Sequence, residues 1–258
     1  MTENKYQPKY PQRVRNELRF RTLNVLSTEQ ISTGFQRIIF GGSDLEGFQS
    51  QGFDDHIKLF FPKVGSAFTP PEITEEGIVW QDNIQPPSRD YTPIFDQQHH
   101  QLIIDFYLHE NGVASDWAAQ ARPGDKLTIG GPRGSLVVPP DYAWQLYVCD
   151  ESGMPALRRR LEELKNLASP VQVTALINIK DEAYKDYLSH LSGFNLQWVI
   201  GDDRKKMTDY LKTLNVPPQD YFIWITGEGK TVSALSQLFE NDAIDSQLLR
   251  AVAYWHNK

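Results

Sequence analysis

The sequence lacks the features that mark several whole classes of protein. Cys149 is the single cysteine among 258 residues, which excludes a disulfide framework within the chain and a multi-cysteine zinc or iron–sulfur site. The 26 basic residues are outnumbered by 33 acidic ones, and the net charge of −7 argues against a nucleic-acid-binding protein. No segment approaches the roughly 20 apolar residues of a membrane span, and the first residues contain no apolar signal-peptide run. We therefore expect a cytoplasmic protein without membrane insertion.

The pattern of apolar segments changes in the middle of the chain. The first half contains short strand-like runs with one short helix expected over 112–121, which is typical of a small antiparallel barrel. Residues 62–88 are rich in proline and glycine and predict a loop-rich insertion. From Trp144 onward, strand-like and helix-like segments alternate, which indicates a mostly parallel sheet covered on both faces. We place the domain boundary after Pro139, with a barrel domain over 1–139 and an α/β domain over 140–258.

The first motif is Arg89-Asp90-Tyr91-Thr92. Arg89 and Tyr91 are two residues apart, so on a strand their side chains share one face. The motif resembles the Arg-x-Tyr-Ser/Thr flavin signature of the ferredoxin reductase superfamily. The resemblance implies that Arg89 grips pyrophosphate oxygens, that the Tyr91 ring lies against the flavin, and that the Thr92 hydroxyl bonds near its reactive nitrogen. Taken alone, the four residues favour the ordinary interpretation, an exposed arginine and a half-buried tyrosine on any strand.

The second motif runs from residue 105 to residue 118 and reads DFYLHENGVASDWA. It is similar to the pattern of the siderophore-interacting proteins, which is roughly Asp-Phe-x-x-His-Gly followed after a gap by Gly-Pro-Ala-Ser-x-Trp-Ala. Ala114 and Ser115 lie where the helix is expected to begin, and free N–H groups at a helix start suit a phosphate. Ordinary alternatives are an N-cap for Ser115, core packing for Trp117 and a structural histidine at His109. The joint spacing favours a flavin site.

Three further segments extend the resemblance to the C-terminus. Gly131-Pro132-Arg133-Gly134 matches the barrel exit of the family, where backbone can approach a dinucleotide closely. Residues 149–156 (CDESGMPA) are similar to its Gly-Asp-Glu-Thr-Ala-x-Pro-Ala turn, which offers helix N-terminal dipoles to a nicotinamide nucleotide. Residues 224–229 (WITGEG) and 254–256 (YWH) resemble its last motifs. Cys149, Ile94 and His256 depart from the usual Gly, Arg and Arg.

The resemblance implies a fold and an activity. The fold is a six-stranded antiparallel FAD-binding β-barrel followed by a parallel-sheet α/β domain that binds NAD(P)H, as in ferredoxin-NADP reductase. The activity is FAD-dependent reduction of Fe(III) in ferric siderophores to Fe(II), with electrons from NADPH, NADH or reduced ferredoxin. A flavin suits this task because it accepts hydride and releases single electrons. Because many ferric siderophores are anionic, an acidic protein needs a local cationic pocket for them.

The candidate site residues fall into three groups, and no metal site is expected. Tyr91 and Thr92 are the catalytic candidates. The cofactor-binding candidates are Arg89, Tyr91, Thr92, Asp105, His109, Ala114, Ser115, Trp117, Gly131, Arg133, Asp150, Glu151 and Glu228. The substrate-binding candidates are Lys58, Arg133, Arg250 and His256.

Two other functions fit the same residues. One is a flavin reductase or electron-transfer flavoprotein for another acceptor, and the other is a siderophore-binding protein without redox chemistry. The visible spectrum of the purified protein separates the second from the reductase. We expect a monomer, and we expect Arg158-Arg159-Arg160 to form a solvated helix face.

Overall fold

The computed structural model describes residues 7–63, 68–75, 77–80, 85–241 and 243–257. The chain forms two compact units, one over Arg13–Leu136 and one that combines Val137–Lys258 with the N-terminal segment ending at Gln12. The predicted boundary after Pro139 stays a prediction. Within the predicted loop-rich insertion, residues 64–67, 76 and 81–84 lie outside the described residues. The described part includes a short hairpin of β5 (Glu72–Thr74) and β6 (Gly77–Val79), which the sequence did not indicate.

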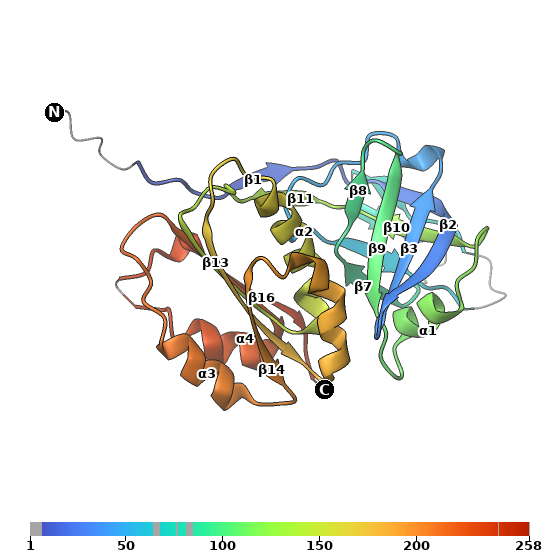
Figure 1. Cartoon of the computed structure of the whole chain (residues 1–258). Helices are drawn as coiled ribbons and strands as arrows, with labels where there is room; N and C mark the ends of the chain where they lie inside the picture. The colour runs from blue at the N-terminus through green and yellow to red at the C-terminus, as the bar shows by residue number, and fades with distance from the viewer. Residues whose placement is uncertain (1–6, 64–67, 76, 81–84, 242, 258) are drawn as a thin grey trace. The chain divides into compact units, whose positions relative to one another are not determined.

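The first unit is built on a curled antiparallel sheet with the strand order β7-β4-β10-β2-β3-β9-β8 (Figure 1). The two ends of this order, β7 (Ser88–Tyr91) and β8 (Ile94–Asp96), are separated in the chain only by Thr92 and Pro93, so the sheet curls back on itself. The other strands are β2 (Phe20–Ser32), β3 (Phe35–Gly41), β4 (Ile57–Phe60), β9 (Gln101–Tyr107) and β10 (Lys126–Gly130). β1 (Gln12–Arg15) pairs with β11 (Gly134–Val137) in a separate two-stranded sheet.

The strand expected to carry the Arg89-Asp90-Tyr91-Thr92 motif is interrupted after Tyr91, and the interruption explains why the sheet has seven strands. Pro93 has no N–H to donate to a ladder, which confines proline to strand ends and breaks. Counting β7 and β8 as one interrupted strand gives the predicted six strands. The predicted barrel-plus-parallel-sheet fold is confirmed.

The core of the first unit follows from alternation along its strands. Leu23 and Val25 in β2 and Ile38 and Phe40 in β3 are buried, while the residues between them are partly exposed. The short helix α1 (Val113–Gln120) packs on β3 and β9 (Figure 1). Its small buried Ala118 allows this close approach. These elements enclose one apolar cluster within the sheet.

The second unit is a five-stranded parallel sheet with the order β14-β13-β12-β15-β16. Every residue of β12 is buried, as expected for a central strand covered on both faces. The strands are β12 (Trp144–Cys149), β13 (Gln172–Ile179), β14 (Asn195–Ile200), β15 (Tyr221–Glu228) and β16 (Leu249–Trp255). The α-helices are α2 (Met154–Lys165), α3 (Arg204–Lys212) and α4 (Gly229–Ser236).

Four 3₁₀ helices complete the described secondary structure. The longest of them is η4 (Glu182–Leu191). The others are η1 (Ser43–Leu45), η3 (Glu151–Gly153) and η5 (Ser246–Leu248). Among the described residues, no helix is long and apolar enough to cross a membrane.

The arginine run in α2 does not form a solvated face, and that expectation is wrong. Arg160 is only 1% exposed. Its guanidinium donates to the carbonyl oxygens of Val138 and Pro139 at 3.1 and 2.8 Å and to the Tyr147 hydroxyl at 2.8 Å. Burial acts to lower the pKa of Arg160, but Tyr147 and Glu163 outweigh it and the pKa is raised. Arg160 therefore ties α2 to the chain segment that precedes β12.

Candidate functional site

The Arg-x-Tyr-Thr motif lies at one end of the strand order, where β7 pairs with β4. Tyr91 pairs with Ile57, and its ring centroid is 4.5 Å from that of Phe106. Burial raises the pKa of Tyr91, against a smaller opposing effect of Arg89, so the phenol stays neutral. Arg89 is exposed, with one guanidinium nitrogen donating to the Ser88 carbonyl at 2.8 Å. The strand thus presents a partly buried neutral phenol beside an accessible guanidinium.

The start of α1 has no side-chain cap. The N-cap residue is Gly112, and its missing side chain leaves room for the His109 ring, which a Cβ at this position would meet. Ser115 is not the N-cap that one interpretation expected, because its hydroxyl accepts the His109 backbone N–H at 2.8 Å. Ala114 is buried in the first turn. The first-turn N–H groups therefore have no side-chain acceptor at the cap position, as an anion-binding helix start requires.

Two other candidates from this stretch, Asp105 and Trp117, make contacts with neighbouring side chains of the first unit. Both Asp105 carboxylate oxygens accept from Arg37, at 2.7 and 2.8 Å, and the two residues are direct cross-strand partners. The sequence analysis missed Arg37. An arginine on a strand that pairs with the strand of Asp105 could have indicated this ion pair. Trp117 stacks on Phe40, with ring centroids 6.3 Å apart and planes 10° from parallel. These contacts are those of residues that stabilise the fold.

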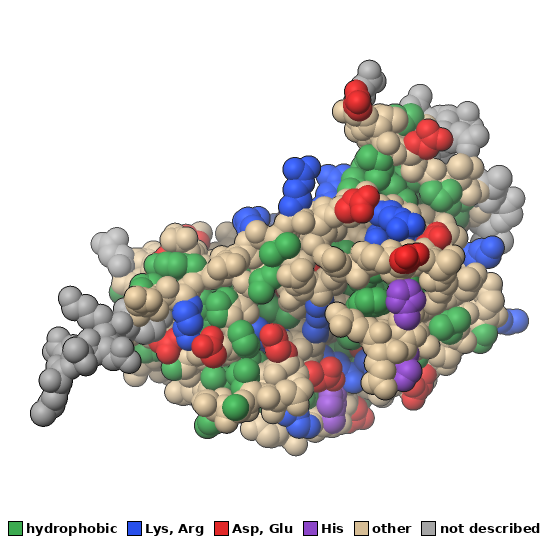
Figure 2. All heavy atoms as spheres, turned by 90° about the horizontal axis from the view of Figure 1, so that it is seen from above, with side chains coloured by type: hydrophobic (Ala, Val, Ile, Leu, Met, Phe, Trp, Pro, Cys, Tyr) green, Lys and Arg blue, Asp and Glu red, His purple; other side chains and the backbone are tan. Residues whose placement is uncertain are grey.

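The candidate cations of the first unit lie near the end of β10. Lys58 pairs with Gly130 across the sheet, and its Nζ is 2.8 Å from Asp90 Oδ1. Gly131 follows with a φ of +97°, a conformation that favours glycine. Arg133 comes two residues later and is exposed. On the face drawn in Figure 2, basic and acidic side chains are interspersed.

In the second unit, Asp150 lies directly after β12 and accepts from four donors. Oδ2 accepts from the Trp255 indole at 2.8 Å and from the Glu228 backbone N–H at 3.0 Å. Oδ1 accepts from the backbone and the hydroxyl of Ser152. Burial raises the pKa of Asp150, although these bonds act to lower it. Asp150 therefore connects the ends of β12, β15 and β16, the edge at which parallel sheets bind ligands.

The remaining candidates lie along the same sheet edge or on β16. Glu151 is buried, and its Oε1 accepts the Lys180 backbone N–H at 2.6 Å. Glu228 is the N-cap of α4 and accepts the Thr231 backbone N–H at 2.9 Å. Arg250 is half-buried in β16 and pairs with Trp224, whereas His256 is exposed at the end of that strand. The His256 ring lies against the backbone at Gly229, where a Cβ would collide with it. Among the described residues, no group of three or more His, Cys, Asp or Glu side chains could hold a metal ion.

This architecture is that of the ferredoxin reductase-like flavoproteins. One solved structure with the same fold is the cytochrome P450 reductase GcoB from Amycolatopsis, with a TM-score of 0.62 over 93% of this chain and 71% of that one. Sequence identity to it is 16%, so the likeness shows the fold alone.

The chain belongs to the siderophore-interacting protein family. Residues 24–136 match the model of the siderophore-interacting FAD-binding domain, and residues 142–258 match that of the siderophore-interacting protein. The NADPH-dependent ferric-chelate reductase of Escherichia coli is 61% identical over 251 residues, covering 97% of this chain and 98% of that protein. The siderophore utilization protein of T. fusca superposes with a TM-score of 0.84 at 29% identity, covering 95% and 96% of the two chains. SipS of Aeromonas hydrophila gives a TM-score of 0.77 at 25% identity, covering 92% of each.

Proposed function

We propose that this protein is an FAD-dependent reductase that converts Fe(III) in ferric siderophores to Fe(II), with NADPH as the electron donor. The observation that carries the proposal is the accessible Arg89 guanidinium and the uncapped α1 start within a domain that matches the siderophore-interacting FAD-binding model. The donor and the chelate substrate are those in the name of the 61% identical relative. Reduction releases iron because the hard oxygen donors of siderophores bind Fe(III) in preference to Fe(II).

The residues of the first unit fit FAD. The uncapped start of α1 and the Arg89 guanidinium are the two kinds of group that bind a pyrophosphate. The neutral Tyr91 ring offers an aromatic face, and Thr92, 6% exposed, offers a hydroxyl next to it. When bound, FAD supplies the conversion between a two-electron donor and a one-electron acceptor.

The remaining assignments extend this proposal. Lys58, Arg133, Arg250 and His256 attract the anionic ferric siderophore, since they are the cationic or titratable candidates on an acidic chain. The carboxyl ends of β12 and β15, organised by Asp150, receive the nicotinamide nucleotide. We propose that the protein acts in the cytoplasm as a monomer. NADH and reduced ferredoxin are the alternative donors.

The first experiment tests the cofactor and the reaction. The purified protein should bind FAD at one equivalent and show flavin absorption bands. Anaerobic NADPH should bleach these bands, and a ferric siderophore should restore them while a ferrous-iron chelator changes colour. Reoxidation no faster with ferric siderophore than with buffer would reject the substrate, and failure to bind FAD would reject the reductase.

The second experiment tests where FAD binds. Arg89→Gln should weaken FAD binding by at least about tenfold, because a charge-assisted contact to phosphate is removed. Arg122→Gln is the matched control, since Arg122 is exposed, like Arg89, lies in the turn after α1 and belongs to none of the motifs. Equal FAD affinity in both variants would remove Arg89 from the site.

A further inference from the structure

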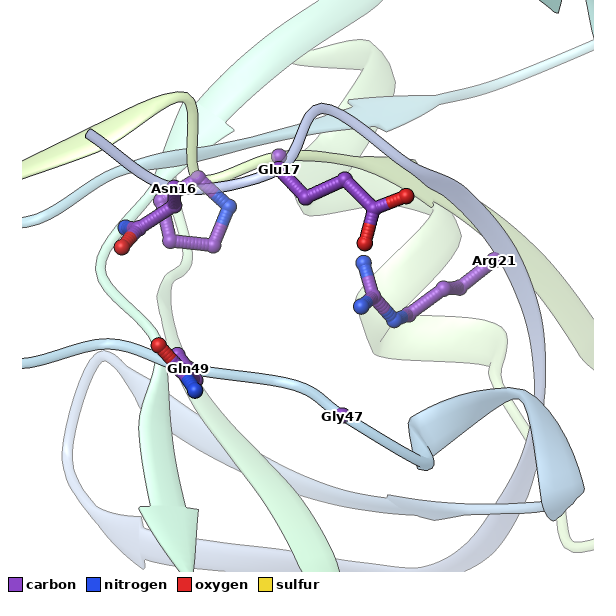
Figure 3. Close-up of a pocket in the computed structure, with 7 residues that line it drawn as sticks. Asn16, Glu17, Arg21, Gly47 and Gln49 are labelled. Atoms are coloured by element: carbon purple, nitrogen blue, oxygen red, sulfur yellow. The ribbon is translucent and has the colours of Figure 1, made fainter.

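A polar pocket of about 110 Å³ lies in the first unit and borders the Gly131-Pro132 turn (Figure 3). Its walls come from the segment before β2, the start of β2, the loop after η1 and the turn after β10. The residues that the argument uses are Asn16, Glu17, Arg21, Gln49 and Gly131. We call it the Arg21 pocket.

Arg21 is a buried cation whose charge is incompletely compensated. It is 4% exposed, and its guanidinium carbon lies 5.4 Å from the centroid of the Phe48 ring. Among the described residues, its Nε–H has no hydrogen-bond partner. Burial and then Arg19 lower the pKa of Arg21 more than Glu17 and Asp44 raise it. A buried guanidinium with an unused donor is costly unless a ligand accepts from it.

The pocket also contains an acceptor without a partner. Ser135 donates its hydroxyl to the Asp55 carboxylate at 2.6 Å and therefore accepts from Asn16 Nδ2 at 3.1 Å. This arrangement fixes the orientation of the Asn16 amide. Within the described part of the chain, Asn16 Oδ1 is buried and has no partner. Two residues that line the pocket thus have unused groups, a donor on Arg21 and an acceptor on Asn16.

Backbone hydrogen bonds join two lining residues to the neighbouring arginines Arg133 and Arg19. The Asn16 backbone N–H donates to the Arg133 carbonyl at 3.0 Å, and the Gly131 N–H donates to the Arg19 carbonyl at 3.2 Å. Both arginines are exposed, as is Arg15 on β1. Among the described residues, Glu17 is the only acidic one that lines the pocket, and Figure 3 shows its carboxylate and the Arg21 guanidinium pointing toward one another. The unused guanidinium donor therefore favours a ligand that accepts a hydrogen bond over a cation.

We propose that the Arg21 pocket binds a pendant carboxylate of the ferric chelate, with Arg21 donating to the carboxylate and Asn16 Oδ1 accepting from a neighbouring amide N–H. A carboxylate suits the side of a guanidinium because two parallel N–H donors match its two oxygens. The volume exceeds that of one carboxylate and admits a short stem. The proposal rests on the proposed function for the identity of the ligand as a ferric chelate, and it adds a preference among such chelates.

The test compares two chelates that differ in one group. N-succinyl desferrioxamine B ends in an amide followed by a carboxylate, whereas N-acetyl desferrioxamine B ends in a neutral amide. Loaded with redox-inert Ga(III), both can be titrated into the FAD-loaded protein by calorimetry without any turnover. We expect the succinyl complex to bind about tenfold more tightly, a ratio that corresponds to one charge-assisted contact.

Three variants locate this preference. Arg21→Gln should reduce the affinity ratio to near one, and Glu17→Gln should increase it because a repelling carboxylate is removed. Arg19→Gln is a charge-matched control, because Arg19 does not line the pocket, and it should keep the ratio. Because Glu17 is exposed, Glu17→Gln remains a test even if Arg21→Gln fails to fold.

The outcomes separate this proposal from the proposed function. A wild-type ratio near one, or a ratio unchanged in Glu17→Gln or in folded Arg21→Gln, overturns the carboxylate site. A loss of FAD affinity in Arg21→Gln with the ratio intact assigns the pocket to the cofactor and also overturns it. If the expected ratios hold but the ferric complexes are not reduced, the carboxylate site stands and the reductase assignment fails.

Discussion

Lys58 and Asp90 are direct cross-strand neighbours on β4 and β7, with Nζ and Oδ1 2.8 Å apart. Their side chains are 43% and 48% exposed. Exposed ion pairs contribute only about 0–1 kcal/mol to stability. The pair matters more for substrate binding, because Asp90 partly neutralises the Lys58 cation that we propose attracts an anionic substrate.

This pair predicts opposite effects of two substitutions. Lys58→Gln should raise KM for an anionic ferric siderophore a few-fold, and Asp90→Asn should lower it, with kcat changed less in both variants. The measurement is steady-state reduction followed with a ferrous-iron chelator at low salt, where charge effects are largest. The difference between the variants should shrink at high salt. KM values that move in the same direction would remove Lys58 from the substrate site.

The buried Arg160 predicts a large effect on stability. Arg160→Lys should lower the free energy of unfolding by about 3–5 kcal/mol, because a single ammonium cannot reach all the acceptors that the guanidinium bonds. Arg159→Lys, at the half-buried neighbouring position, should cost no more than about 1 kcal/mol. Urea unfolding of both variants measures the contrast. Equal costs would contradict the tie between α2 and the segment before β12.

Cys149 predicts a thiol that is unreactive in the folded protein. Burial first, and then Asp150 and Glu151, raises the pKa of Cys149 well above its ordinary value of 9.0. A thiol reagent should therefore label the native protein very slowly at pH 8–9 and rapidly in urea. Rapid labelling of the native protein would show that the thiol is accessible.

The same residue predicts a pH dependence of stability. Below pH 9 the thiol is protonated in both states and contributes no pH dependence. Above pH 9 the unfolded thiol ionises while the folded one does not, so the free energy of unfolding falls as pH rises. Cys149→Ala removes this contribution, and the difference between the two proteins from pH 8 to 10.5 isolates it. A difference that does not vary with pH would contradict the raised pKa.

The predictability of the candidate site differs from residue to residue. The Arg-x-Tyr-Thr strand and the start of α1 were located correctly because each depends on a contiguous motif in a recognisable local structure. The partners of Asp105 and Asp150 were not foreseen, because Arg37 and Trp255 lie 68 and 105 residues away from them. The exposure of Arg160 was mispredicted because the repeated arginines gave no sign that the third one faces the interior.

The sequence by itself determined the order of the two architectures, because strand-like runs followed by alternating strands and helices reflect local backbone preferences and apolar periodicity. It also located the family motifs, which are contiguous. Only the tertiary structure decided which polar groups are satisfied internally and which are not. Asp105 and Asp150 are used within the fold, whereas Arg21 is left with an unused donor, because burial and hydrogen bonding depend on segments that meet only when the chain folds.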